Sequence, residues 1–185
     1  ILSLTLHYLG LDPNSLDAKD YTDKALPLLK SIRPYIKYFH SSQYINDLAN
    51  GDICAVVGWS GDILQARDRA NEAGAGVEVA YSIPKEGAAT WFDMIAIPAD
   101  ADNVDNAHKF LDFLMDPEVI AGITNYVSYP NGNADAMQYV DEAIRNDKAI
   151  YPSAETMKGL FTMKVMPPKI SRVRNRVWTK LKTGQ

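Results

Sequence analysis

The chain has few of the residues that bind metals or form disulfides. It contains one cysteine, Cys54, and three histidines, His7, His40 and His108. A single cysteine excludes an internal disulfide. The histidines lie far apart, and neither an H-x-x-x-H nor a C-x-x-C spacing occurs, so we expect no metal site. Because Cys54 lies in the apolar run 53–57, we interpret it as a small core residue.

Long apolar runs and phosphate-binding loops are also missing. No apolar segment approaches the roughly 20 residues that a membrane-spanning helix needs, and the first residues show no leader pattern. Neither the G-x-x-x-x-G-K-[ST] nor the G-x-G-x-x-G motif occurs. The formal charge of −4 argues against a nucleic acid as partner. These absences leave a globular protein for which we expect no cofactor.

Hydrophobic periodicity predicts alternating helices and strands. The apolar run 53–59 lacks polar alternation, which is typical of a strand covered by helices on both faces. Such alternation predicts an α/β fold with open sheets. The expected strands are 34–40, 53–59, 77–84 and 91–98. The expected helices are 1–9, 17–31 (kinked at Pro27), 43–51, 62–74, 103–115, 116–127 and, near the C-terminus, pieces at about 133–146, 153–160 and 170–182.

The stretch 52–62, DICAVVGWSGD, comes near to a serine-hydrolase motif. A nucleophile elbow is G-x-S-x-G at a strand-to-helix turn. Gly58 and Ser60 match it, but Gly61 comes one residue early and Asp62 stands in its place. A triad would also need a histidine, and His108 lies in a predicted helix. A serine hydrolase built on Ser60 is therefore the alternative hypothesis.

The same stretch offers an indole beside a carboxylate, and so does a second segment. Trp59 precedes Asp62, and Trp91 and Asp93 would share one face of a strand over 91–98. An alkylammonium group is stabilised by a carboxylate and by an aromatic face, and a dication needs at least two acids. The two pairs fit a pocket for a diamine. In the competing interpretation both tryptophans are core residues and both aspartates cap helices, Asp62 the helix that follows it.

The C-terminal segment is strongly basic. Residues 169–182 contain six Lys and Arg residues and no acid. Apolar residues recur at helical spacing in the same segment: Ile170, Val173, Val177 and Leu181. We interpret it as a packed helix with a solvated cationic face, and a nucleic-acid or membrane patch is the alternative. The nucleic-acid alternative is the weaker one, because no aromatic platform is interleaved with the charges.

Three long segments resemble one known family. They are YFHSSQYINDLANGDICAVVGWSGD (38–62), YSIPKEGAATWFDMIAIPADA (81–101) and MPPKISRVRNRVWTKLKTG (166–184). With the spacing between them, they closely resemble the putrescine and spermidine receptors of bacterial ABC importers from about residue 4 onward. The resemblance implies a type II periplasmic binding protein fold, two α/β lobes joined by a hinge, with this chain as its C-terminal half. Residues 1–76 would then begin the second lobe, 77–129 would complete the first lobe, and 130–185 would form the C-terminal helices of the second lobe.

The resemblance also implies a function and a site. The chain would be part of a monomeric periplasmic receptor, not an enzyme, that is made with a signal peptide and delivers a polyamine to a membrane permease. Five residues match pocket positions of the family: Trp59, Asp62, Trp91, Asp93 and Tyr129. Trp59, Trp91 and Tyr129 would line the carbon chain, while Asp62 and Asp93 would pair with the amines. Spermidine-preferring members tend to carry Trp where putrescine-preferring members carry Phe, so Trp91 favours spermidine.

Overall fold

The computed structural model describes residues 1–184, which form two compact units. The first unit contains residues 1–40, 83–92 and 154–184, and the second contains 41–82 and 93–153. The lobe boundaries expected above refer to a complete receptor and stay a prediction.

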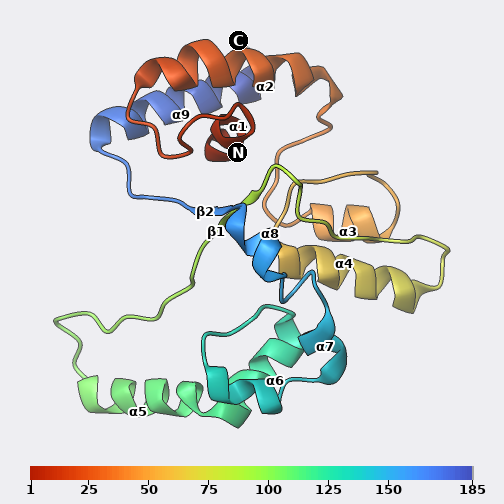
Figure 1. Cartoon of the computed structure of the whole chain (residues 1–185), viewed down its shortest axis with the longest axis vertical. Coiled ribbons are helices and arrows are strands. Elements are labelled where there is room, and N and C mark those ends of the chain that lie inside the picture. Colours follow the sequence, from red (N-terminus) through yellow and green to blue (C-terminus); the bar gives the residue numbers. More distant parts are fainter. Residues whose placement is uncertain (185) are drawn as a thin grey trace. The chain divides into compact units, whose positions relative to one another are not determined.

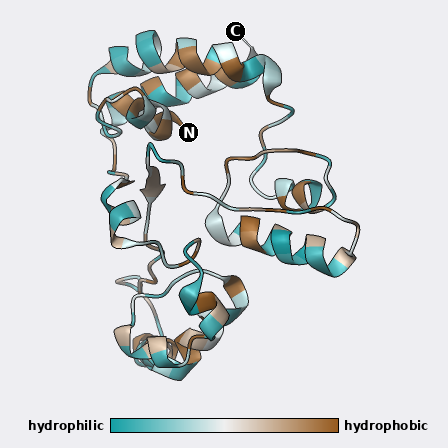
Figure 2. Cartoon of the chain, turned by 45° about the vertical axis from the view of Figure 1, so that its right-hand side comes forward, coloured by the Kyte–Doolittle hydropathy of each residue, from teal (hydrophilic) through white to brown (hydrophobic). Residues whose placement is uncertain are grey.

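The first unit is mainly helical (Figure 1). Its helices are α1 (Leu2–Tyr8), η1 (Asp20–Ala25), α2 (Leu26–Ile32), η2 (Arg33–Tyr35), α8 (Ala154–Lys158) and α9 (Pro168–Thr183). Four of these helices, α1, η1, α2 and α9, contribute the residues of its buried core. The apolar stripe of α9 is buried against Leu6, Tyr21 and Leu29, as the periodicity predicted. In Figure 2 these helices carry both brown apolar and teal polar residues, as expected for helices with one buried face.

Pro27 changes the helix that the sequence predicts over 17–31. The segment divides into a π-helical turn, η1, and the α-helix α2, whose first turn contains Pro27. Proline is tolerated there because its missing N–H would have no partner within the helix. The predicted helix is therefore not one regular α-helix, and the kink expected at Pro27 stays a prediction.

A small parallel sheet also belongs to the first unit. Strand β1 (Ala88–Thr90) pairs with β2 (Leu160–Thr162), with Ala88 opposite Leu160. The chain enters β1 through Gly87, whose φ is 99°. A Cβ at Gly87 would lie 2.0 Å from the carbonyl oxygen of Gly159, so only glycine fits there.

The second unit is helical in the residues that the structure describes. It contains α3 (Tyr44–Ala49), α4 (Ser60–Ala73), α5 (Val104–Met115), α6 (Pro117–Val127), η3 (Ala134–Gln138) and α7 (Glu142–Asn146). Ala49, Ala66 and Ala70 let α3 and α4 approach closely, and Ala121 packs with Ala136 where α6 meets η3. The helix predicted over 133–146 is thus two short ones.

The four predicted strands are not formed within residues 1–184. The segments 34–40, 53–59, 77–84 and 91–98 lack the ladder of a strand, and β1 lies just before the last of them. A strand exists only where a neighbouring strand accepts and donates its backbone hydrogen bonds, and these runs have no such neighbour here. Cys54 is correspondingly exposed, so its interpretation as a core residue is wrong for this chain. No helix of the described chain has the length and apolar character needed to cross a bilayer.

Candidate functional site at the start of α4

Asp62 lies in the first turn of α4, and it is not the residue that caps the helix. The helix begins at Ser60, and its N-cap is Trp59, which has an extended backbone with φ −81° and ψ 140°. The competing interpretation of Asp62 as an N-cap is therefore wrong. A negative charge in the first turn of a helix interacts favourably with the positive end of the helix dipole.

Tyr44 fixes the position of the Asp62 carboxylate. Its hydroxyl donates a hydrogen bond of 2.5 Å to Oδ2 of Asp62, and the backbone N–H of Trp59 donates to the same hydroxyl at 3.3 Å. The Tyr44 side chain comes from α3 and is almost fully buried. The sequence does not single out Tyr44, because its place in an apolar helix stripe is equally typical of a core residue and 18 positions separate it from Asp62.

Two glycines make room for the tyrosine rings around this turn. A Cβ at Gly61 would lie 2.1 Å from a ring carbon of Tyr129, and a Cβ at Gly58 would lie 2.9 Å from the ring of Tyr44. Both distances are too short for a real contact, so the rings occupy the space that larger residues would need. Aromatic packing thus explains the two glycines of the G-W-S-G sequence that suggested a nucleophile elbow.

Burial and nearby carboxylates raise the pKa values of both tyrosines. Burial, followed by the hydrogen bond to Asp62, raises the pKa of Tyr44. Burial also raises the pKa of Tyr129. The charges of Asp62 and Asp93 raise this pKa further, whereas hydrogen bonds from the backbone N–H groups of Gly61 and Asp62 lower it. Both carboxylates therefore raise the pKa of the same group, the hydroxyl of Tyr129. Within residues 1–184 neither Asp62 nor Asp93 forms an ion pair, so the two charges remain available to a cation.

The shift at Tyr44 predicts how stability depends on pH. The folded protein keeps a proton that the unfolded chain loses near pH 10.0, so the resulting stabilisation is complete below that pH and is lost as the pH rises through the raised pKa. Replacing Tyr44 with Phe should lower the free energy of unfolding at pH 7 by about 1.5–3 kcal/mol, because a hydrogen bond to a charged group is lost. The substitution should also make the fall of the free energy of unfolding above pH 10 less steep.

Urea unfolding between pH 7 and pH 11 measures both effects. Tyr126→Phe is the matched control, because Tyr126 is 90% exposed and its hydroxyl has no hydrogen-bond partner in the described chain. Equal pH profiles for Tyr44→Phe and the unsubstituted protein would contradict the assignment.

The remaining expected site residues fall in different parts of the molecule. Trp59, Asp62, Asp93 and Tyr129 belong to the second unit, whereas Trp91 belongs to the first. Trp91 and Asp93 both lie in an exposed segment that is not a strand, so the argument that strand alternation places them on one face is wrong for this chain. Trp91 is 37% exposed directly after β1.

Ser60 has no catalytic partner in the described residues. It is the first residue of α4, and its hydroxyl forms no hydrogen bond to a histidine or to any other group there. Across residues 1–184 no cluster of three or more His, Cys, Asp or Glu residues could hold a metal ion. The geometry favours cation binding over nucleophilic chemistry.

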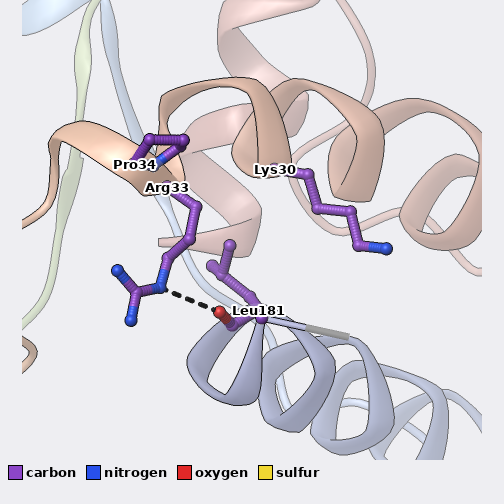
Figure 3. A pocket seen from close by; sticks show the side chains of 5 residues that line it. Lys30, Arg33, Pro34 and Leu181 are labelled. Atoms are coloured by element: carbon purple, nitrogen blue, oxygen red, sulfur yellow. Dashed lines mark hydrogen bonds between the residues drawn. The ribbon is translucent and has the colours of Figure 1, made fainter.

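A cavity in the first unit has the wrong charge for an amine. Figure 3 shows it between the end of α2 and the end of α9, lined by Lys30, Arg33, Pro34, Leu181 and Gly184. Nε of Arg33 donates to the carbonyl oxygen of Leu181 at 3.2 Å. Two cationic side chains would repel an ammonium group, and none of the expected site residues lines this cavity.

Comparison with known proteins places the chain in a family. Residues 2–152 match the family model described as bacterial extracellular solute-binding protein. The chain belongs to this family. Its members bind solutes and are not described as enzymes, and the periplasmic location of its named relatives agrees with the expected one.

Named relatives include binding proteins for polyamines. The chain is 54% identical over 185 residues to the putrescine-binding periplasmic protein PotF of Escherichia coli, covering 100% of this chain and 50% of that protein. It is 33% identical over 159 residues to the spermidine/putrescine-binding periplasmic protein of the same organism, covering 86% and 44%. The chain spans about half the length of these relatives.

A solved structure confirms the expected fold class. The spermidine/putrescine ABC transporter substrate-binding protein PotD from Streptococcus pneumoniae superposes with a TM-score of 0.80 at 27% identity, covering 99% of this chain and 55% of that one. The α/β fold of periplasmic binding proteins is therefore confirmed for this half. The helices and the small parallel sheet described above are the part of that fold that this chain forms.

Proposed function

We propose that this chain is the C-terminal half of a periplasmic receptor that binds putrescine or spermidine between two lobes and delivers it to an ABC importer. The observation that carries the proposal is a pair of carboxylates, Asp62 and Asp93, that both raise the pKa of Tyr129 and that form no ion pair within residues 1–184. The named relatives support the class of ligand, because a putrescine-binding protein is 54% identical along the whole chain.

Each residue of the proposed site has a distinct role. Asp62 and Asp93 pair with ammonium groups, and Tyr44 holds the carboxylate of Asp62 in place. Trp59 and Tyr129 form apolar walls for the methylene chain, where the aromatic faces also attract the cations. Trp91 completes the wall when the receptor closes around its ligand, and closure presents the bound form to the permease.

The relative preference for spermidine rests on Trp91 alone. An indole changes the shape of the pocket compared with the phenyl ring that is typical of putrescine-preferring relatives. The 54% identity to a putrescine-binding protein supports the opposite preference, so measured affinities must decide between the two amines.

A thermal-shift series tests the proposal on a receptor of the full length seen in the relatives. At a concentration 100 times the Kd, a ligand stabilises the folded state by about 2.7 kcal/mol, which should raise the Tm of a receptor about twice as long as this chain by about 3–4 °C. We expect this shift with putrescine and spermidine but not with neutral amino acids at the same concentration. The 185-residue chain alone should respond weakly, because part of the proposed cleft lies outside it. A full-length receptor that responds to amino acids and not to amines would refute the proposal.

A further inference from the structure

The two compact units carry opposite charge. The first unit contains 14 Lys and Arg residues and 6 Asp and Glu residues, and the second contains 5 and 17. Their formal charges are therefore +8 and −12, which together give the −4 of the whole chain. The acidic unit contains both carboxylates of the proposed amine site, Asp62 and Asp93. The polyamine does not account for the excess positive charge of the first unit, because like charges repel.

Much of that positive charge lies in one line along α9. Lys169, Arg172, Arg176 and Lys180 are all exposed, and their spacing of three, four and four residues places them on one face of the helix. The helix contains no acid between Pro168 and Thr183. Within the described chain none of the four cations forms an ion pair or a side-chain hydrogen bond. We call this line of residues the cationic face of α9.

The other cations of the helix have partners within the first unit. The guanidinium of Arg174 lies over the ring of Tyr21 and donates to the hydroxyl of Ser3, and the ammonium of Lys182 lies over the ring of Trp178. These contacts help to hold the helix on its core. The cationic face thus differs from the rest of the helix in having no such role.

The cationic face lacks the anchors of a protein–protein interface. Stable interfaces are centred on buried aromatic and apolar residues, surrounded by a polar rim. The one aromatic residue of α9, Trp178, instead packs edge-on against Phe39 at a centroid distance of 5.0 Å. A helix face that offers only positive charge fits a partner surface that carries many negative charges. A layer of phosphate groups is such a surface.

We propose that the cationic face of α9 docks the protein on a bilayer that contains anionic phospholipids. Each Lys or Arg near such a surface contributes about fivefold to binding, so four together give an increase on the order of several hundredfold. That is too weak for permanent attachment and strong enough to concentrate the protein near the membrane. The contact should weaken steeply with salt, because the charges are exposed. The proposal does not depend on the identity of the ligand.

Co-sedimentation with lipid vesicles tests the proposal. The 185-residue chain is mixed at low salt with vesicles of phosphatidylcholine alone or of phosphatidylcholine with 30% phosphatidylglycerol. We expect binding to the anionic vesicles only, and its loss near 0.5 M NaCl. The double variant Arg172→Gln/Arg176→Gln should bind about twentyfold more weakly. The control Lys19→Gln/Lys85→Gln changes the net charge equally at exposed sites outside α9 and should bind within about twofold of the unsubstituted chain.

Each other outcome overturns the proposal in a defined way. Absence of binding to anionic vesicles at low salt refutes it directly. An equal loss in both double variants would show a diffuse effect of the net charge of the unit rather than a docking face. Competition by millimolar inorganic phosphate at constant ionic strength would indicate a site for free phosphate instead of a lipid surface. Circular dichroism of both variants checks that α9 stays folded.

Discussion

Replacing Asp93 with Asn in a full-length receptor is expected to weaken polyamine binding by about 2 kcal/mol or more, which is about thirtyfold. When one member of a buried charge pair is removed, the other stays in a poorly solvated place without its partner, and such truncations cost about 2–5 kcal/mol. Asp93 is exposed in this chain, so the loss arises only when the ligand and the closed receptor exclude water from it. Calorimetric titration with putrescine and spermidine measures the effect.

Asp100→Asn is the matched control for this experiment. It removes the same charge from the same unit, and Asp100 is exposed and without an ion pair in the described residues. Long-range attraction alone should change the affinity little and equally in both variants, because exposed charges are screened by salt. An unchanged affinity for Asp93→Asn would refute the assignment of Asp93 to the site.

Replacing Gly61 with Ala should damage both the stability and the site. The new methyl group would lie within the ring of Tyr129, so the ring or the first turn of α4 must move. Overpacking of this kind typically lowers the free energy of unfolding by about 1–3 kcal/mol. Because Tyr129 is a proposed wall of the pocket and Asp62 follows Gly61 directly, we expect the affinity of the full-length receptor for polyamine to fall at least tenfold.

Gly122→Ala separates packing from helix propensity. Gly122 lies inside α6, has an ordinary helical backbone, and a Cβ there would meet nothing within 4 Å. Alanine at such a position should be neutral or stabilising by up to about 1 kcal/mol. Urea unfolding of the two variants should therefore show changes of opposite sign. A Gly61→Ala variant as stable as Gly122→Ala would contradict the close packing of Tyr129 on the turn.

The exposed apolar segments of this chain have a common physical cause. The run 53–57 and the segment 92–96 are typical of sheet interiors, and α5 leaves Phe110 and Phe113 more than half exposed. The relatives are about twice as long, so their folds can supply neighbours that this chain does not contain. Strand formation depends on such neighbours, whereas helices satisfy their backbone within one segment. This difference explains why the helices were predicted well and the strands were not.

The sequence by itself determined the helices, the buried stripe of α9, the α/β class and, through long family segments, the class of receptor. Those features depend on local periodicity or on extended similarity, and both can be read along one chain. Only the tertiary structure decided that Asp62 is held by Tyr44 rather than capping its helix, and that Gly58 and Gly61 make room for aromatic rings. These contacts join residues 14 to 68 positions apart, and packing in space, not spacing in sequence, brings them together.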